Sequence, residues 1–448
     1  MKINKLFAFL LAGTILLGAC GKEDTPDPVD PNTIFIAEGG TLSGSYTQKV
    51  VVQGKNINVK GFTYFASGST LTIPAGTTIK ADFVEKTAII IERGAKITAE
   101  GTATAPIIFT SSKPVGQRNP GDWGGIIILG KAMTNRTTEP TIEGGVGRPY
   151  GGSDNTDNSG VMKFVRIEFS GIAAQPNSEI NGLTFGAVGS GTVIENIQVT
   201  YGNDDAFEWF GGNVNAKNLV AFATADDDFD FDFGYTGRIQ FAVALRDPDF
   251  VDSNDAGNGI EADNDGSGSA AIPNTRPVLS NFTFVGPGVT TLGFHNFGNR
   301  WRRSVNFVLN NSVMLNWAKG GFSMESDATV NSYNTGVSEF RNNIVHALVD
   351  PYRTFATSPL SAAQVRTKAE SEGVITLTTA ADVRLTSLAL TAPNLIPVTG
   401  SPVLTGAAFG ASLPTSFFIT TTYRGAFGTT NWMANWTKFD FPKTATGY

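Results

Sequence analysis

The sequence predicts an all-β protein built as a parallel β-helix, in which the chain winds into stacked coils of short strands. From about Ile34, short apolar runs alternate with turns rich in Gly, Asn and Asp, and long amphipathic helical patterns are absent. Residues 204–209 (DDAFEW) align with residues 226–231 (DDDFDF) at an offset of 22. A coil of this length stacks equivalent residues ~4.8 Å apart. A β-sandwich or a propeller is the weaker alternative, because neither requires like residues at a fixed offset.

Composition supports this fold and excludes several functions. Glycine (51) and phenylalanine (32) are abundant, which suits a β-structure with many turns and an aromatic interior. The formal net charge is −7, and nucleic-acid binding depends on cationic contacts to phosphate, so we exclude a nucleic-acid partner. The chain has one cysteine and two histidines, His295 and His346. Disulfides, thiolate catalysis and a metal site built from several histidines are therefore not expected.

The first residues predict secretion and a lipid anchor. A basic start, an apolar run and small residues before Cys20 form a signal peptide over residues 1–19. A cysteine directly after the cleavage point resembles the bacterial lipobox, which implies a lipid on Cys20; the alternative is an ordinary signal peptide. Residues 20–33 are rich in proline and acids and predict an extended tether. Lys22, Glu23 and Asp24 resemble the export signal of Bacteroidota surface lipoproteins, which implies an outer-membrane protein facing the exterior.

The predicted β-helix covers residues 34–345. Its clearest early strands lie within residues 71–111, where each apolar run ends in a turn. Similar apolar runs follow at residues 161–169, 194–199, 278–284 and 340–345. Because side chains alternate along a strand, the run 228–233 should direct Phe229, Phe231 and Phe233 inward and Asp228, Asp230 and Asp232 outward.

Residues 346–448 are less regular, and we expect them to continue the β-helix and cap it. Ser361 predicts the start of a short helix that reaches about Ala369. The remaining residues to Phe441 are expected to close the open end of the last coil, which would otherwise expose unpaired strand edges. Four aromatic residues are predicted to cover that coil, with an aromatic platform for sugars as the alternative: Trp432, Trp436, Phe439 and Phe441.

Several stretches resemble known proteins. The segments TLTIPAGTTIKA (70–81), AKITAEGTATAPIIFTS (95–111) and GDWGGIIILGKA (121–132) resemble secreted right-handed parallel β-helix proteins of the pectin-lyase-like superfamily. Residues 203–220, the run DDDFDFDFGY and the ending 423–442 resemble a poorly characterised group of Bacteroidota surface lipoproteins. This resemblance implies a right-handed, single-stranded solenoid. It also implies a role in capture or uptake beside a TonB-dependent receptor, because such lipoproteins often accompany one.

A row of acids is the main candidate site, and Ca²⁺ is its predicted cofactor. If Glu208 stacks on Asp230, two carboxylates lie about 5 Å apart, and their repulsion is roughly 3 kcal/mol at an effective dielectric of ~20. Ca²⁺ relieves this repulsion with six to eight oxygen ligands. The alternative is neutralisation by Arg238, Arg246 or Lys217, or by water. The candidate metal ligands in the two coils are Asp204, Asp205, Glu208, Asp226, Asp227, Asp228, Asp230 and Asp232.

A second acidic patch contains Glu261, Asp263 and Asp265. Asp263, Asp265 and Ser267 match the first positions of a calcium loop, but Asn274 stands where such a loop needs a bidentate glutamate. The patch is therefore not an EF-hand. It is either a second Ca²⁺ site or a hydrated insertion.

The segment 300–303 is the candidate ligand-binding segment, because beside His295 it offers a base and an aromatic platform. Its residues are Arg300, Trp301, Arg302 and Arg303. The alternative is that its arginines pair with acids of neighbouring coils or contact a partner. We expect a non-catalytic binding or accessory protein with a glycan ligand or a partner receptor, and we assign no catalytic residue. The superfamily contains polysaccharide lyases and glycoside hydrolases, so a carbohydrate-active enzyme is the first alternative. A structural or adhesion protein is the second.

Overall fold

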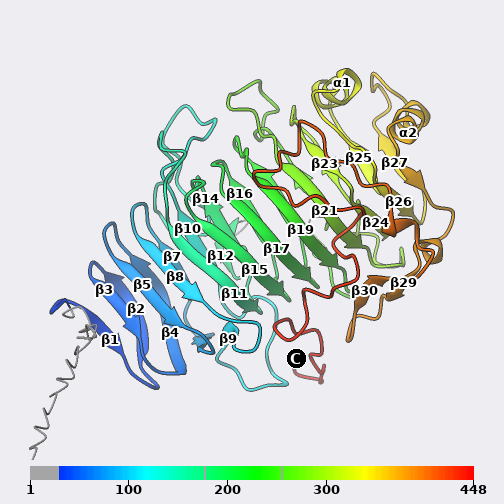
Figure 1. The fold of residues 1–448 in the computed structure, drawn as a ribbon. Coiled ribbons are helices and arrows are strands. Elements are labelled where there is room, and N and C mark those ends of the chain that lie inside the picture. Colours follow the sequence, from blue (N-terminus) through cyan, green and yellow to red (C-terminus); the bar gives the residue numbers. More distant parts are fainter. Residues whose placement is uncertain (1–29, 176–177, 254–255) are drawn as a thin grey trace, which may run out of the picture.

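The computed structural model describes residues 30–175, 178–253 and 256–448, and it confirms the parallel β-helix. Twenty-six strands form one continuous sheet that winds along the molecule, and every pair of strands within it is parallel. Each coil contributes strands to three ladders, which run side by side from the N-terminal to the C-terminal end (Figure 1). The predicted signal peptide, Cys20 and most of the tether lie outside the described residues.

The strands of each ladder follow one another coil by coil. The first ladder contains β1 (Ile34–Ile36), β3 (Lys49–Val52), β5 (Thr70–Pro74), β8 (Lys96–Glu100), the first halves of β11 (Gly160–Glu168), β15 (Val193–Thr200), β17 (Asn215–Phe222), β19 (Arg238–Leu245) and β21 (Val278–Val285), and then β23 (Val308–Asn310). The second contains β2 (Thr41–Tyr46), the start of β4 (Asn56–Phe65), β6 (Thr78–Ala81), β9 (Ile107–Ser111), the second halves of the five long strands, β24 (Val313–Trp317), β26 (Ile344–Ala347) and β28 (Ile375–Thr376).

The third ladder carries the candidate site. It contains the end of β4, β7 (Ala88–Ile91), β10 (Ile126–Leu129), β14 (Leu183–Gly186), β16 (Phe207–Phe210), β18 (Phe229–Asp232), β20 (Glu261–Ala262), β22 (Arg300–Trp301), β25 (Phe322–Met324) and β27 (Tyr352–Thr354). Elements outside the ladders are the hairpin β12 (Ala173–Gln175) and β13 (Ser178–Glu179), α1 (Asp327–Thr335), α2 (Ala362–Ser371), η1 (Ala380–Val383), β29 (Leu385–Ser387), β30 (Asn394–Pro397) and η2 (Pro402–Leu404).

The offset of 22 residues is confirmed where it was predicted. Phe207 pairs with Phe229 and Glu208 with Asp230 in a parallel register. The rings of Phe207 and Phe229 are stacked, with centroids 5.4 Å apart and an interplanar angle of 5°. The next two coils are longer because loops are inserted between strands, so Asp230 pairs with Glu261 and Glu261 with Arg300.

The predicted alternation in residues 228–233 holds only in part. Phe229 and Phe231 are fully buried in the core, as expected. Phe233 is not: its φ of +50° turns the chain out of the strand, and its ring packs against Phe210 on the outer side of the third ladder. Asp228 is buried rather than outward, because it lies in the turn before β18.

Asparagines bend the long strands between the first and second ladders. Asn196, Asn218 and Asn281 have φ values of +57°, +59° and +62°, and asparagine adopts this left-handed conformation more readily than other residues with a side chain. At the same bend, β11 carries Phe164 and β19 carries Phe241, both with positive φ. These two rings lie beneath the C-terminal segment described next.

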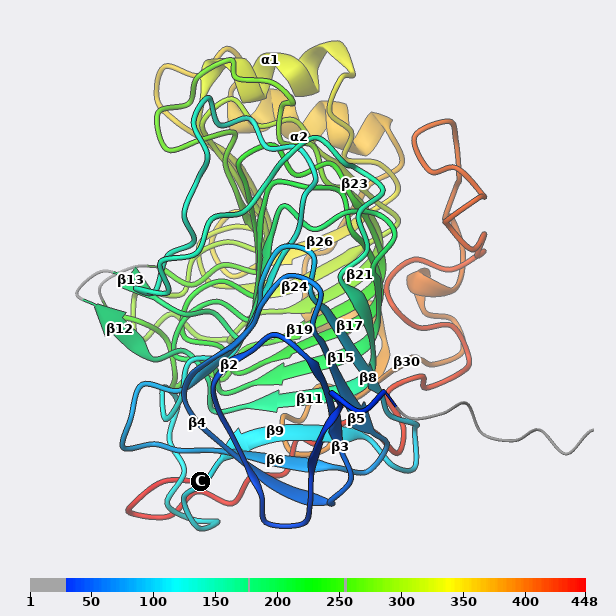
Figure 2. The same ribbon diagram turned by 90° about the vertical axis from the view of Figure 1, so that its left-hand side faces the viewer.

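The C-terminal residues 377–448, here called the tail, do not close the last coil, which corrects the sequence-based expectation. The tail runs back along the outer side of the solenoid toward its N-terminal half (Figures 1 and 2). Trp436 and Tyr448 pack there against outward side chains of the second ladder, including Phe169 and Tyr201. The predicted helix is present as α2, which Ser361 caps, and Val365 and Ala369 of α2 enter the core.

Three side-chain amides hold the tail in place. Gln198, Gln240 and Asn311 each donate to a backbone carbonyl of the tail and accept from the N–H of the same residue, at distances of 2.7–3.0 Å. Their partners are Lys438, Ile419 and Ala408, respectively. Each amide therefore makes the same two hydrogen bonds to the tail that the backbone of a neighbouring strand would make. The C-terminal residue, Tyr448, pairs with Arg118 through backbone hydrogen bonds.

The stacked core makes a prediction about stability. Phe229→Ala removes a fully buried ring from the stack and is expected to lower the free energy of unfolding by about 3–5 kcal/mol. Phe83→Ala is the matched control, because Phe83 is half exposed, and it should change the free energy by about 1 kcal/mol or less. Urea unfolding followed by circular dichroism measures both. Equal effects of the two substitutions would contradict the stacked core.

Candidate acidic site

Outward-facing acids of the third ladder form a continuous row. Glu208, Asp230 and Glu261 occupy the same position on three successive coils, and Arg300 occupies it on the fourth. The parallel register alone brings these side chains together, because each lies one strand spacing from the next. We call Glu208, Asp230 and Glu261 the acidic row.

A second set of acids lies in the turns that precede these strands. The carboxylate of Asp205 accepts a hydrogen bond from the N–H of Asp227, one coil further, at 2.8 Å. Asp227 accepts in turn from the N–H of Asn258 at 2.6 Å, and Asn258 accepts from Phe297 at 3.2 Å. These side chains satisfy buried backbone donors where the chain enters each strand. Asp227 therefore has a structural role in addition to its charge.

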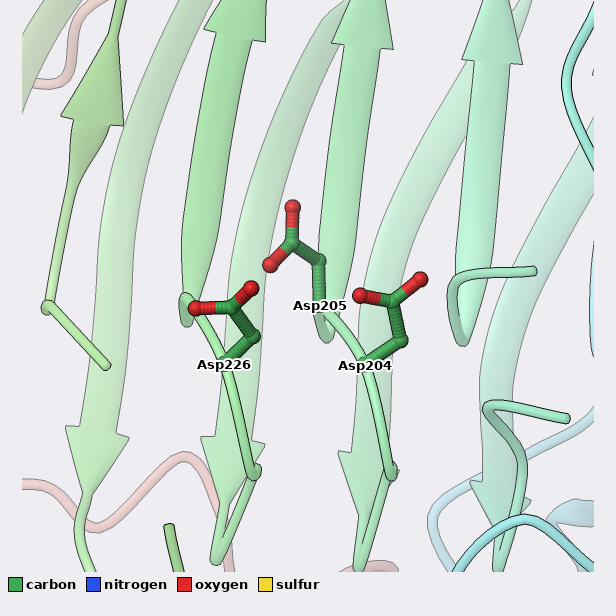
Figure 3. Close-up of side chains that lie close together, drawn as sticks. All are labelled: Asp204, Asp205 and Asp226. Carbon is green, nitrogen blue, oxygen red and sulfur yellow. The ribbon is translucent and has the colours of Figure 1, made fainter. Parts of the chain in front are cut away.

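Two groups of three carboxylates are close enough to share a cation. One group is Asp204, Asp205 and Asp226, which gather at two neighbouring turns (Figure 3). The other is Asp205, Glu208 and Asp230. Within each group the ligand oxygens lie within 4.8 Å of one another. Oxygens 2.3–2.6 Å from a Ca²⁺ ion are separated by up to ~5 Å, so both groups have the dimensions of a cation site.

Burial and mutual repulsion disfavour negative charge on these carboxyl groups. Burial raises the pKa of Asp205, Glu208 and Asp230 well above the ordinary value, and neighbouring acids raise it further. Burial is likewise the main reason that the pKa of Asp232 rises to about 8. A bound cation or a proton is needed to stabilise such a cluster.

Glu208 and Asp230 of the acidic row border an open pocket of about 330 Å³. An insertion between β10 and β11 forms its other wall and contributes Glu143 and Tyr150. Glu143 is hydrogen-bonded to Glu208, and burial raises its pKa. The remaining lining residues come from the ladder and its turns, or from the same insertion: Thr141, Ile142, Glu208, Phe210, Asp230, Asp232, Phe233, Asp263, Arg302 and Arg303.

Sequence reasoning did not identify Glu143 or Tyr150. The insertion has no counterpart in neighbouring coils, so the 22-residue repeat carries no information about where it packs. Its apolar residues Ile142 and Val146 are buried against the outer side of the third ladder. The one sequence signal was that Glu143 lies next to apolar residues in a long turn, which indicates that this part of the turn packs against the solenoid.

The second acidic patch is neutralised by arginines and hydrogen bonds, which argues against its predicted Ca²⁺ site. Glu261 pairs with Arg300 at 2.8 Å and also with Arg302, and Asp263 pairs with Arg302 and Arg303 at 2.7 and 2.5 Å.

The carboxylate of Asp265 accepts hydrogen bonds from residues of its own turn and is not arranged as a ligand of a calcium loop. Burial opposes its ionisation, but hydrogen bonds from the side chains and N–H groups of Ser269 and Ser267 outweigh this effect and lower its pKa. Its oxygens are therefore already engaged within the turn.

Side chains alternate along the candidate ligand-binding segment, so its arginines and its tryptophan lie on opposite sides of the strand. Trp301 is fully buried and stacks on Phe307 with centroids 4.2 Å apart, so its ring is in the core and offers no platform to a ligand, which corrects that expectation. Arg300 bridges Glu261 and Glu325. Arg302 and Arg303 line the pocket, where both pair with Asp263.

Of the three cations considered as neutralising partners, one takes that role. Arg246 forms a fully buried ion pair with Asp228 at 3.0 Å, so Asp228 is an ion-pair partner rather than a metal ligand. Lys217 lies over the ring of Phe417 instead, 4.7 Å from its centroid.

Comparison with known proteins identifies the family. Residues 44–386 match the model of the pectate-lyase-like β-helix domain, and the chain therefore belongs to this family. Neither the curated proteins nor the solved structures gave a significant match. Within the described residues, no helix is long and apolar enough to cross a membrane.

The raised pKa values predict how stability depends on pH when metal is absent. A carboxyl group with a raised pKa binds its proton more tightly in the folded state, so its ionisation costs stability as the pH rises from the ordinary value near 4. For Asp232 this loss extends to about pH 8. In EDTA, the Tm of the protein should therefore be higher at pH 5 than at pH 8. The double variant Glu208→Gln/Asp230→Asn should show a smaller difference, and an unchanged difference would contradict the assignment.

Proposed function

We propose that this protein is an outer-membrane lipoprotein, exposed at the cell surface, whose β-helix binds a glycan without catalysis through a calcium-loaded acidic site. The observation that carries the proposal is the convergence of Asp205, Glu208 and Asp230 beside an open pocket. The site lies on a rigid ladder, and its second wall is an insertion that packs on that ladder.

The donor set favours Ca²⁺ among common metal ions. All the ligand atoms offered by the two groups are carboxylate oxygens, which suit a hard cation and not one that prefers nitrogen or sulfur. Ca²⁺ accepts six to eight oxygens in variable geometry, whereas Mg²⁺ requires a nearly ideal octahedron. Carboxylates from separate coils and turns suit the less demanding ion. Backbone carbonyls or water would complete its coordination.

A cation also explains how an acidic pocket accepts a sugar. Ca²⁺ at the acidic row offsets its negative charge and presents open coordination positions to hydroxyl or carboxylate groups. Arg302 and Arg303 line the same pocket, and the side chain of Arg303 is 45% exposed. A glycan rich in hydroxyl or carboxylate groups can contact both the ion and Arg303.

The calcium site makes a direct prediction. Calcium at 100 times its Kd adds ~2.7 kcal/mol to the free energy of unfolding, so adding Ca²⁺ after EDTA treatment should raise the Tm. Glu208→Gln/Asp230→Asn should abolish that rise. The matched control Glu100→Gln/Asp440→Asn removes two exposed acids of the same types and should retain it. A rise that is equal in all three proteins would refute the site. Differential scanning fluorimetry measures the shifts.

The lipid anchor is tested independently of the site. Cys20→Ser removes the thiol that would carry the lipid, and the protein should move from the membrane fraction to the soluble fraction. Fractionation and labelling with palmitate measure this change, and proteinase K added to intact cells tests surface exposure. Membrane retention of an unlabelled Cys20→Ser protein would argue against the anchor.

The proposed partner is a TonB-dependent receptor, which the resemblance to Bacteroidota surface lipoproteins supports. Affinity purification from detergent-solubilised outer membranes should recover such a receptor with this protein. Recovery of the protein alone would argue against the accessory role and would leave the calcium site unaffected.

A carbohydrate-active enzyme is the second candidate, and the contact between Glu143 and Glu208 favours it. Glu143 and Glu208 are hydrogen-bonded neighbours, and burial raises the pKa of each carboxyl group, which is the environment that a catalytic carboxyl pair uses for proton transfer. If the site is catalytic, Glu143→Gln should lower the turnover of a cleavable polysaccharide at least about 100-fold, the usual contribution of a general acid or base. Assays of released reducing ends and of unsaturated products cover hydrolases and lyases, and no turnover on a broad polysaccharide panel excludes this candidate.

A further inference from the structure

A second pocket lies on another side of the molecule, between the tail and the solenoid. Its volume is about 380 Å³, within the ~300–1,000 Å³ that small-ligand sites occupy. Asn218 and Phe241 form its floor, and both are bend residues with positive φ. The tail supplies the walls: Ile419, Tyr423, Gly428, Thr429, Thr430 and Trp432. The acidic pocket shares none of these residues.

The walls of this pocket are held by contacts on both sides. Gln240 fixes the backbone of Ile419 through two hydrogen bonds of 2.7 and 2.8 Å. The ring of Trp432 stacks on Phe427 with centroids 5.2 Å apart, and its Nε1–H donates to the carbonyl of Ala426 at 2.8 Å. A Cβ on Gly428 would lie 2.7 Å from the ring of Tyr423, so that ring packs closely against the glycine backbone. The pocket therefore exists before any ligand binds, which limits the ordering cost of binding.

Phe241, at the floor of the pocket, has an unfavourable backbone conformation. Asn218 and Asn281 occupy the bends of the coils on either side, but β19 carries Phe241 there with a φ of +63°. A bulky residue in this conformation costs energy that asparagine largely avoids. Because Phe241 stands at this bend in place of an asparagine, an aromatic ring lies under the tail at the floor of the pocket.

The lining defines the chemistry of the ligand. Three aromatic residues, Phe241, Tyr423 and Trp432, provide apolar surfaces. Thr429, Thr430 and the amide of Asn218 provide polar groups, and none of the eight lining residues carries a charge. A sugar ring matches this combination, because its C–H face is apolar and its hydroxyls hydrogen-bond at the rim. An ionic ligand would lose its hydration without gaining a partner of opposite charge.

We propose that this pocket, which we call the tail pocket, binds a neutral sugar ring. The site is separate from the acidic site and needs no calcium. The sequence-based alternative of an aromatic sugar platform thus retains one of its four residues, Trp432. Trp436 is fully buried, and Phe439 and Phe441 pack against Phe222 and Phe169, respectively.

The test uses the intact protein and a panel of neutral gluco-, manno-, galacto- and xylo-oligosaccharides, with oligogalacturonates as the charged comparison. Saturation-transfer NMR and quenching of tryptophan fluorescence report binding. At least one neutral sugar should bind in EDTA, and Glu208→Gln/Asp230→Asn should not change its Kd. Ile419→Glu places a charge on a half-exposed wall residue and should weaken binding at least about tenfold.

Val398→Glu is the matched control, because Val398 is an exposed tail residue that does not line the pocket, and it should change the Kd less than about twofold. Equal Tm values for the two variants show that both remain folded. Three outcomes overturn the proposal: no neutral sugar binds, Ile419→Glu binds as tightly as the wild type, or the charged oligosaccharides bind at this pocket in preference. Failure here leaves the calcium site standing, since the two are probed by different variants and by EDTA.

Discussion

The parallel, in-register stacking of coils is the constraint on which the rest of the structure depends. Hydrogen bonds between coils fix each residue one strand spacing above its equivalent, so residues of the same type at equivalent positions are brought into contact. Where those residues are aromatic, the result is a stabilising stack, as between Phe207 and Phe229. Where they are acidic, the same geometry forces carboxylates together. Phe207 and Glu208 are neighbours in sequence, and the alternation of side chains along the strand places them on opposite sides, one in the aromatic stack and one in the acidic row.

The tail gives the solenoid a second set of long-range contacts. Gln198, Gln240 and Asn311 use side-chain amides to pair with a backbone that runs across the coils instead of along them. Coils that are far apart in sequence are thereby tied to one segment, whereas strand pairing links only neighbours. The same arrangement creates the tail pocket, which neither the coils nor the tail would form alone.

The sequence predicted the features that follow from the repeat and missed those that do not. The register of Asp230 on Glu208 was predictable, because the offset of 22 residues and the alternation of side chains determine it. Glu143 and Tyr150 were not predictable, since an insertion without a repeat has no register to read. Trp301 stands between two arginines, which suggests a surface position, but the alternation of side chains from Arg300 and Arg302 directs it inward. The path of the tail depends on single amides and aromatic contacts, which no local pattern encodes.

The most direct test of the account is a crystal structure of the protein with calcium, followed by a soak in a lanthanide that gives anomalous scattering. The account predicts an anomalous peak between Asp205, Glu208 and Asp230, coordinated by their carboxylate oxygens, and its loss in Glu208→Gln/Asp230→Asn. It is contradicted if those carboxylates carry no ion in the presence of calcium and pair instead with basic side chains, because the stacked acids would then have a purely structural explanation.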